Sequence, residues 1–443
     1  MMPFRNIYSK FLINIILPIS DKILSTSVSY HYNLIKRLNS FSSYQIIEWQ
    51  NYNLHKIVNH AYYNTKYYNA LFIKNNITPK DIKTVDDLHK IPILTKEIIN
   101  KNFQDLIPKQ IDDINFKKQS TGGSSGMPLK FNIDLDSWSY ITANRMIYME
   151  KYGYKYGDKY LAIGSTSLFP TKKKSFLHDI YYSMKNKIGV NGVNMSDDVI
   201  LDCIDLIKKH KIKFLYGYTS SIFLIADFCL KNKIQIDIKS VFTTSETLTE
   251  HYEKTIIDAF NCNLVDIYSA HDGGIHAVRT SNSIYEVGYN SFYITKNLKH
   301  NIGEILLTNL QNYSLPFLNY DVGDRVKIDN SSTNKKLYNG QTLKRVYGRK
   351  SDIINLENGR QLTGPGFTIL FKDLNVNAYQ ISKIGKMKIL CKIMINNNFK
   401  KQEKDLIVET IKKHSGDDCE IQLEVVKNFE KLKSGKLHYF LSK

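Results

Sequence analysis

A run of small residues at positions 120–128 reads Ser-Thr-Gly-Gly-Ser-Ser-Gly-Met-Pro. Its three glycines let the backbone turn tightly, and successive N–H groups with Ser and Thr hydroxyls can then bind phosphate oxygens. No Gly-Lys-Ser/Thr follows, so the run is not a Walker loop. Such a run is also typical of a plain linker. Its position before the strand-like residues 130–133 favours a phosphate-binding loop.

Asp272 stands before two glycines, directly after the strand-like residues 264–269. A carboxylate at such a strand end can hold a magnesium ion that bridges nucleotide phosphates, and it can equally be a surface Asp in a turn. His271 and His276 lie beside it. Two histidines without a third nearby ligand are weak evidence for zinc.

Three further residues carry chemistry in short polar segments. Asp324 ends the sequence Tyr-Asp-Val-Gly-Asp and can accept hydrogen bonds from both hydroxyls of a ribose. Arg349 lies where a domain junction is expected and could reach a nucleotide. Lys436, in a Lys-Ser-Gly-Lys loop, can bring positive charge to a transition state. The plain alternatives are an ordinary turn, a polar linker and a solvated lysine.

The middle of the chain predicts alternating strands and helices. Strands are expected at 213–218, 240–244 and 264–269, and helices at 219–230 and 249–260, with Thr219 or Ser220 as the N-cap of the first helix. This order implies parallel strands with right-handed crossovers. Ligands bind at the carboxyl ends of such strands, so residues 218–220, 244–246 and 268–274 are expected to share one crevice.

The flanking sequence predicts the remaining architecture. Residues 1–100 show mostly helical spacing, and the chain from Gly348 onward predicts a small α+β unit with strands at 387–395 and 421–425 and a helix at 405–414 ended by Gly416. The expected fold is α/β. A large domain at 1–347 would contain mixed and parallel sheets flanked by helices, and a small mobile C-terminal domain would follow at 348–443.

Composition supports a folded protein without a membrane span. Hydrophobic residues make up 42% of the 443 residues, enough for a sizeable core. The apolar run at 11–19 is shorter than the roughly 20 residues that a span needs, and no signal-peptide cleavage site follows it. A helix packed on the main domain is expected there, with a partner-binding surface helix as the alternative. The five cysteines form no CxxC motif, which fits a reducing cytoplasm.

The chain is strongly basic, with a formal net charge of +19. Such a charge is typical of polyanion binding. However, only eight of the 61 basic residues are arginine, and the lysines are spread along the whole chain. A generally solvated basic surface is therefore the favoured interpretation. We expect no nucleic-acid partner and at most peripheral membrane association.

The order and spacing of these segments resemble the adenylate-forming superfamily of acyl-CoA synthetases. More closely, the chain resembles the branch that contains phenylacetate–coenzyme A ligases and adenylating proteins of capsular polysaccharide biosynthesis. The resemblance covers almost the whole chain. It rests on the segments discussed above and on five more: Lys66-Tyr67-Tyr68, residues 91–96 (Ile-Pro-Ile-Leu-Thr-Lys), Tyr218-Thr219-Ser220, residues 244–248 (Thr-Ser-Glu-Thr-Leu), and residues 309–324.

The resemblance implies a role for each candidate residue. The phosphate loop would comprise Ser120, Thr121, Gly122, Gly123, Ser124, Ser125 and Gly126, with Thr121, Ser124 and Ser125 cradling ATP. Ser245 and Glu246 would line the adenine side and Tyr268 would stack near the base. Asp324 would hold the ribose with Arg349 close by. Lys436 would be the adenylation lysine and Asp272 the Mg²⁺ ligand; with His271 they are the candidate catalytic residues.

Some positions depart from the family pattern. The family usually has Glu where Asp272 stands, Gly at Ser269, and a small or hydroxyl residue at His271. It usually has Arg at Asn319 and an acid at Ser351. These changes affect the expected geometry of the nucleotide site and of the hinge near residues 350–351.

The resemblance implies an ATP- and Mg²⁺-dependent ligase that activates a carboxylic acid as an acyl-adenylate. The acyl group would pass to a thiol, of coenzyme A or a carrier, or to an amine or hydroxyl of a polysaccharide precursor. One alternative is an adenylyltransferase that stops at the nucleotidylated product. Another is a non-catalytic basic binding protein.

Overall fold

The computed structural model describes residues 2–120, 129–164, 186–192, 195–270, 272–279, 283–328, 340–348, 353–363, 367, 370–371, 374–427 and 440–442. The chain forms two compact units. The first unit comprises Met1–Thr121, Leu129–Asp158 and Ile267–Tyr347. The second comprises Gly122–Pro128, Lys159–Asp266 and Gly348–Lys443.

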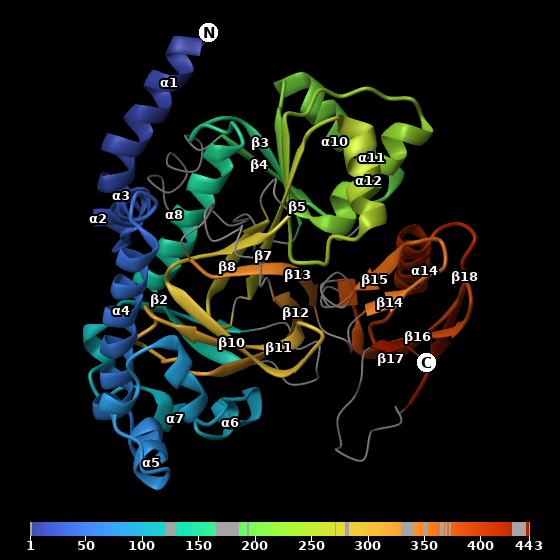
Figure 1. Cartoon of the computed structure of the whole chain (residues 1–443). Helices are drawn as coiled ribbons and strands as arrows, with labels where there is room; N and C mark the ends of the chain where they lie inside the picture. Colours follow the sequence, from blue (N-terminus) through green and yellow to red (C-terminus); the bar gives the residue numbers. More distant parts are fainter. Residues whose placement is uncertain are drawn as a thin grey trace. The chain divides into compact units, whose positions relative to one another are not determined.

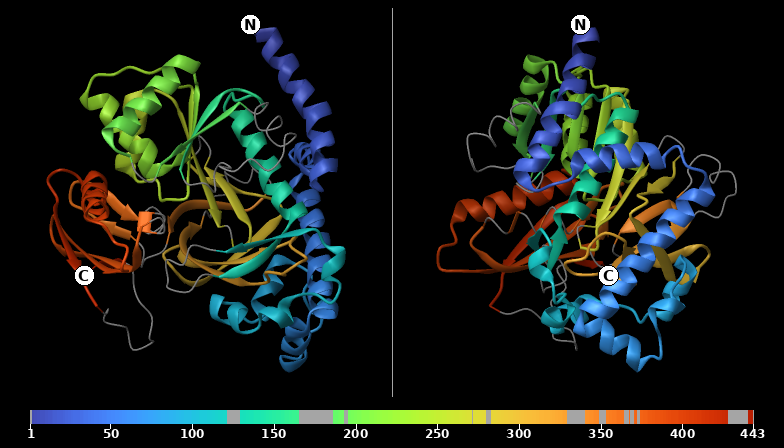
Figure 2. Two further views of the ribbon diagram at one scale, coloured as in Figure 1. Left: turned by 180° about the vertical axis from the view of Figure 1, so that it is seen from behind. Right: turned by 90° about the vertical axis from the view of Figure 1, so that its left-hand side faces the viewer.

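The first unit begins with a series of helices (Figure 1, Figure 2). Polar caps begin several of them: the Ser42 and Thr95 hydroxyls accept from the backbone N–H groups of Gln45 and Ile98. The α-helices are α1 (Met2–Phe11), α2 (Leu17–Leu24), α3 (Val28–Leu38), α4 (Ser43–Asn64), α5 (Lys66–Lys74), α6 (Lys96–Lys101), α7 (Phe103–Leu106) and α8 (Leu135–Lys151). Between them lie the π-helical turn η1 (Leu12–Ile16) and the 3₁₀ turns η2 (Pro79–Asp81), η3 (Val85–Lys90) and η4 (Ile111–Asp113).

The strands of the first unit pair mainly in antiparallel fashion. β1 (Phe116–Ser120) pairs with β2 (Lys130–Asp134). A larger sheet runs in the order β10-β11-β12-β13-β9-β8-β7. Its strands are β7 (Asn263–Ala270), β8 (Ile275–Arg279), β9 (Tyr285–Val287), β10 (Ser291–Lys299), β11 (Ile302–Asn309), β12 (Tyr320–Ile328) and β13 (Thr342–Gly348).

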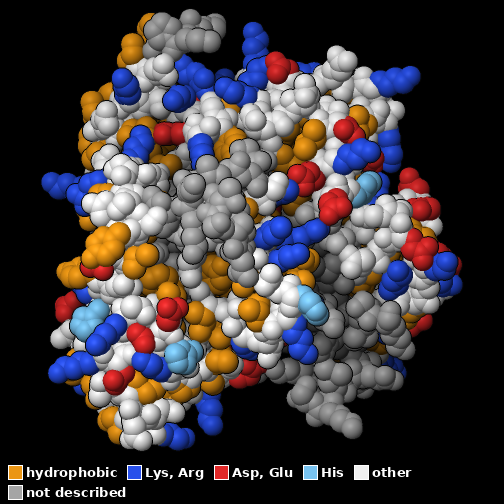
Figure 3. Space-filling view, viewed as in Figure 1, with side chains coloured by type: hydrophobic (Ala, Val, Ile, Leu, Met, Phe, Trp, Pro, Cys, Tyr) orange, Lys and Arg blue, Asp and Glu red, His pale blue; other side chains and the backbone are white. Residues whose placement is uncertain are grey.

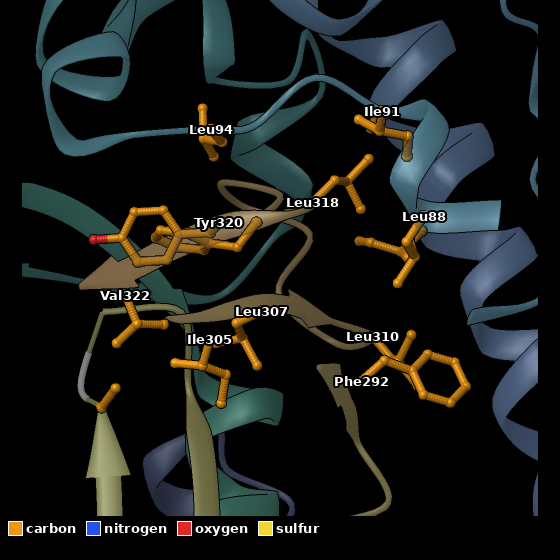
Figure 4. Close-up of a cluster of buried hydrophobic side chains, with 14 of the residues drawn as sticks. Leu88, Ile91, Leu94, Phe292, Ile305, Leu307, Leu310, Leu318, Tyr320 and Val322 are labelled. Atoms are coloured by element: carbon orange, nitrogen blue, oxygen red, sulfur yellow. The ribbon is translucent and has the colours of Figure 1, made fainter. Parts of the chain in front are cut away.

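One hydrophobic core joins these strands to the N-terminal helices. In Figure 4 the ring of Tyr320 lies between Leu94 and Val322, and its hydroxyl points away from the aliphatic side chains. Tyr320 is fully buried and Leu94 is 1% exposed. Burying each such side chain contributes about 1.5–3 kcal/mol. The core therefore fixes the segment around Leu94 on β12.

The second unit contains a parallel sheet in the order β6-β5-β3-β4. The strands are β3 (Tyr160–Gly164), β4 (Lys187–Asn191), β5 (Phe214–Tyr218) and β6 (Ser240–Thr244). Every residue of β5 and β6 is buried, as expected for parallel strands covered on both faces. The flanking helices are α10 (Asp197–His210), α11 (Thr219–Lys231) and α12 (Glu250–Phe260). The strands and helices predicted at 213–269 are thus confirmed.

The C-terminal part of the second unit has its own sheet, in the order β18-β17-β16-β19, and its own core. The helix α14 (Lys401–Ser415) is followed by Gly416 as its C-cap; the positive φ of 103° suits glycine, and the N–H of Gly416 donates to the carbonyl of Lys412. The elements are β14 (Ile353–Asn355), β15 (Gln361–Thr363), β16 (Val376–Gly385), β17 (Lys388–Ile395), α14 (Lys401–Ser415), β18 (Glu420–Val425) and β19 (Phe440–Ser442).

Arg360 connects this C-terminal part to the helices of the second unit. Its guanidinium lies 3.0 Å from the carboxylate of Asp227 and donates to the carbonyl of Lys413 at 2.8 Å. It also lies over the ring of Phe223, 5.2 Å from the centroid. Next to it, the Tyr252 hydroxyl donates to the carbonyl of Gln361 at 3.1 Å. We call these six residues the Arg360 cluster.

The predicted α/β class is confirmed, with a mixed sheet flanked by helices and a small C-terminal part. The chain changes unit at Gly348, but residues 348–443 share a unit with 159–266, so the domain limits stay a prediction. No helix within the described ranges is long and apolar enough to cross a membrane. Lys and Arg side chains occur over most of the face seen in Figure 3, interspersed with acids rather than gathered in one patch.

Candidate functional site

Two candidate nucleotide residues of the first unit contact each other. Tyr268 lies on β7 and Asp324 lies on β12, and both are half-buried. The Tyr268 hydroxyl donates to Oδ2 of Asp324 at 2.7 Å. The residue proposed for the adenine base and the residue proposed for the ribose are therefore neighbours. Such an arrangement can bind a nucleoside, with a ring surface for the base beside a carboxylate acceptor for hydroxyls.

Asp272 is buried and bound from two sides. The Tyr320 hydroxyl donates to its Oδ2 at 2.6 Å, and the Lys96 ammonium lies 3.1 Å from the same oxygen. The side chains of Lys96 and Asp272 are 17% and 6% exposed. A buried carboxylate is stable only when paired in this way. Lys96 belongs to the 91–96 segment, and sequence reasoning gave it no role.

The residues around Asp272 do not fit a magnesium ion held by the protein. A cation at Oδ2 would compete with the Lys96 ammonium that already neutralises this oxygen. Among the residues that the structure describes, no group of three or more His, Cys, Asp or Glu side chains is gathered to hold a metal. The role of Asp272 as a Mg²⁺ ligand stays a prediction, and this geometry does not favour it.

The turn after Asp272 requires its two glycines. Gly273 and Gly274 have φ of 86° and 75°, a conformation that other residues rarely adopt. A Cβ on Gly274 would lie 2.4 Å from the side-chain amide nitrogen of Asn309. That amide in turn donates to the carbonyl of Gly273 at 2.9 Å. Asn309, at the end of β11, therefore fixes the loop that carries Asp272.

Lys96 is positioned by a short backbone ladder. The N–H of Leu94 donates to the carbonyl of Asn319, and the N–H of Asp321 donates to the carbonyl of Leu94. Thr95 then caps α6, so Lys96 is its first residue. Asn319 has a φ of 53°, which Asn tolerates better than most residues, and its amide donates to the carbonyl of Ile91 at 2.6 Å. Asn in place of the family's Arg thus has a structural role here.

In the second unit, Glu246 joins two of the predicted polar segments. Its carboxylate accepts from the backbone N–H of Ser220 at 2.7 Å, and its carbonyl accepts from the Thr219 hydroxyl at 3.1 Å. The ends of β5 and β6 therefore meet, as parallel strand ends should. Ser245 is exposed with a φ of 72°, a conformation that costs a non-glycine residue about 1 kcal/mol or more.

The predicted N-cap of α11 was wrong. The N-cap is Tyr218, which makes no side-chain capping bond, and Thr219 is already helical. Glu246 supplies the missing acceptor from the next strand end, across 26 residues of sequence. A carboxylate near a helix N-terminus is also favoured by the helix dipole. Local sequence rules cannot detect a cap from another element.

His276 is a buried core residue. Burial lowers its pKa to about 3, so the ring is neutral. The Asn144 amide donates to its Nδ1 at 3.0 Å. His276 lies on β8 with an amide partner, and these contacts give it a packing role.

Several predicted site residues lie outside the described residues: Thr121, Gly122, Gly123, Ser124, Ser125, Gly126, His271, Arg349 and Lys436. Ser120 ends β1, where it pairs with Lys130. The third predicted strand end, at 268–274, falls in the first unit, whereas 218–220 and 244–246 fall in the second. The structure thus brings together Tyr268 with Asp324, and Glu246 with Ser220.

Sequence comparison identifies two relatives and one family model. Residues 356–443 match the model of the CapK C-terminal domain. Over 406 residues the chain is 25% identical to Protein CapK of Staphylococcus aureus. This match covers 90% of this chain and 89% of that protein. Over 181 residues it is 27% identical to indoleacetate–lysine synthetase of Pseudomonas savastanoi, but this match covers 39% of this chain and 44% of the synthetase.

Structure comparison finds the same fold in 2-hydroxyisobutyryl-CoA ligase. The crystal structure of that ligase with 2-HIB-AMP and CoA aligns with a TM-score of 0.61 at 14% identity, over 92% of this chain and 91% of that one. The structure with R3-HIB-AMP aligns with a TM-score of 0.58 at 14% identity, over 92% of both chains. At this identity the likeness establishes the fold.

Proposed function

The chain is a homologue of Protein CapK with the fold of an acyl-CoA ligase of the adenylate-forming superfamily, and we propose that it is an ATP-dependent ligase that activates a carboxylic acid as its acyl-adenylate. The contact between Tyr268 and Asp324 carries this proposal. It places a ring and a carboxylate side by side at the end of β7 and on β12, where the base and the ribose of one nucleotide can bind.

The reaction joins a substrate carboxylate to the α-phosphorus of ATP and releases pyrophosphate. Little covalent chemistry is asked of the protein, so positioning and charge neutralisation account for catalysis. In this proposal Asp324 holds the ribose, Glu246 and Ser245 line the base, and Lys436 neutralises charge at the reacting oxygens. Magnesium would accompany the ATP phosphates and neutralise part of their charge.

The acceptor of the acyl group belongs to one of two chemical classes. The fold shared with a CoA ligase supports a thiol, of coenzyme A or of a carrier. The second class is an amine or a hydroxyl, for example of a polysaccharide precursor. The partial match to a lysine synthetase supports an amine. Both begin with the same adenylate, so the first half-reaction can be tested without knowing the acceptor.

The first test is a screen of carboxylic acids with ATP and Mg²⁺, in which hydroxylamine traps the activated acyl group as a hydroxamate. With the best acid, Lys436→Ala should reduce acid-dependent pyrophosphate exchange by at least about a hundredfold, since removing one preorganised charge costs about 3 kcal/mol. ATP binding, measured by calorimetry, should remain. Asp324→Asn should instead weaken ATP binding.

Normal exchange in Lys436→Ala would contradict the role of that lysine. A stable adenylylated product that forms without any carboxylate activation would favour the adenylyltransferase alternative. The absence of ATP turnover with every acid, together with salt-dependent polyanion binding, would favour the non-catalytic alternative.

A further inference from the structure

The first 24 residues carry a row of exposed hydrophobic side chains on α1, η1 and α2. Phe4, Ile7, Phe11 and Ile15 are 81%, 63%, 42% and 49% exposed. Ile19 and Ile23 continue the row with 53% and 59% exposure. Isolated exposed apolar residues are common, but a continuous row of this kind is typical of an interaction surface. We call these six residues the apolar row.

The spacing of the row places it on one side of the helix. From Ile7 to Ile23 the members recur every fourth residue. In a regular α-helix this repeat drifts by about 40° at each step, because a turn takes 3.6 residues. The wider π-helical turn η1 (Leu12–Ile16) reduces the rotation per residue at the middle of the row. The row therefore stays on one face from α1 into α2, which Figure 2 shows as one continuous run of helix.

The opposite face of the same helices is held to the first unit. The Arg5 guanidinium donates to Oδ1 of Asp158 at 2.6 Å and to the carbonyl of Gly153 at 2.9 Å. Leu12 and Leu17 are each 1% exposed. A Cβ on Gly157 would lie 2.5 Å from Cδ1 of Leu12, so the helix lies directly on this backbone. These contacts prevent the helix from rolling over to bury the apolar row.

The charges beside the row have one sign. Lys10 and Lys22 are exposed. Asp21, the acid of this segment, is buried and accepts from the Thr26 hydroxyl and from the N–H groups of Val28 and Ser29. The exposed charged side chains of residues 4–24 are thus all basic and lie on the same segment as the apolar row. In Figure 3, which has the same view as Figure 1, hydrophobic and basic side chains occur together at the upper left, where α1 lies.

We propose that the apolar row of α1–α2 binds the surface of an anionic lipid bilayer, with the helix lying in the plane of the headgroups. A helix with one apolar face flanked by lysines inserts that face about 5–10 Å into the interface. Anionic lipids complement Lys10, Lys22 and the net charge of +19. A second copy of the chain fits less well, because two such faces would bring their lysines together.

The test is flotation of the whole protein with vesicles of equal parts phosphatidylcholine and phosphatidylglycerol. The wild type should float with these vesicles, and added salt or pure phosphatidylcholine should weaken binding. Ile7→Asp and Ile15→Asp should each lower the partition coefficient about tenfold or more. Ile15→Leu should bind like wild type. Leu298→Asp is the matched control, since Leu298 is 47% exposed on β10 of the same unit, and it should also bind normally.

Equal thermal unfolding of all variants would show that the substitutions spare the fold, as expected for exposed positions. Failure of the wild type to float would overturn the proposal, and so would equal loss in Leu298→Asp. A concentration-dependent dimer in light scattering that Ile15→Asp abolishes would assign the apolar row to a second copy instead. None of these outcomes depends on ligase activity.

Discussion

Lys96 and Asp272 form a buried ion pair in a position where the resembled family suggests a metal ligand. We expect Lys96→Met to lower the free energy of unfolding by about 3–5 kcal/mol, because it leaves the Asp272 carboxylate buried without its cation. Urea denaturation measures this loss. The double variant Lys96→Met/Asp272→Asn should regain most of it, because the charge is removed with its partner.

The exposed pair of Lys90 with Asp87 supplies the control. Its side chains are 40% and 22% exposed, so Lys90→Met should cost less than about 1 kcal/mol. If Lys96→Met were no more destabilising than Lys90→Met, Lys96 would not be the main partner of Asp272.

Candidate site residues can be picked out of the sequence one by one, but the contacts between them cannot. Asp324 and Tyr268 stand in recognisable segments, yet the hydrogen bond between them joins residues 56 apart. Lys96 reaches Asp272 across a still longer stretch of chain, and nothing local to either residue indicates the pair. Asn309 was also missed, because its function is to hold the backbone of a distant glycine turn.

At the level of elements, the Arg360 cluster holds β15 and α14 against α11. Arg360→Met should lower the free energy of unfolding by about 2–3 kcal/mol, from lost charged hydrogen bonds and the lost contact with the Phe223 ring. Hydrogen exchange should increase first in β14 and β15. Arg345→Met is the control, because Arg345 is exposed on β13, where it lies over Tyr347. Equal effects of the two substitutions would contradict a special role for Arg360.

Strong periodic elements were predictable, and their ends were less so. The parallel strand β5 was evident because its sequence, Phe-Leu-Tyr-Gly-Tyr, is a short and mostly apolar run of the kind that fully buried strands give. The helix expected at 405–414 begins earlier, at Lys401, where the Glu403 carboxylate accepts from the backbone N–H of Lys400 at 2.7 Å, a contact that the apolar spacing does not reveal. The prediction of the α11 N-cap failed for a related reason: the acceptor, Glu246, comes from another element.

For the whole molecule, two buried histidines predict a loss of stability in mild acid. Burial lowers the pKa of His276 to about 3 and that of His414 to about 4. The unfolded chain binds protons at these groups near pH 6.5, whereas the folded chain does not. The free energy of unfolding should therefore fall as pH drops below about 6.5, by at most about 1.4 kcal/mol per pH unit and histidine.

Asp134 opposes this trend over part of the range. Burial raises the pKa of its carboxyl to about 6, so the folded chain holds a proton there between about pH 4 and 6 and gains stability as pH falls through that window. With two histidines against one such acid, a net loss should remain. Denaturation at a series of pH values measures it, and His276→Leu should reduce the slope below pH 6.5. An unchanged slope would show that His276 is protonated in the fold.

The division of the chain into units was the least predictable feature. Sequence reasoning placed a boundary near residue 348, and the chain does change unit there. It could not predict that 159–266 and 348–443 would be grouped together, because that grouping depends on contacts such as Arg360 with Asp227.

The π-helical turn at Leu12–Ile16 makes the orientation of α1 depend on chain length as well as on side chains. A turn of this kind holds one residue more than the α-helical turn it replaces. Deleting one residue there would restore an ordinary α-helical turn and leave the side chains upstream facing nearly as before, because the π-helical turn holds the extra residue. Phe4 and Ile7 would stay exposed and Arg5 would stay beside Asp158, whereas a deletion within the regular helix α1 would rotate the residues before it by about 100° and turn Phe4 away from the row.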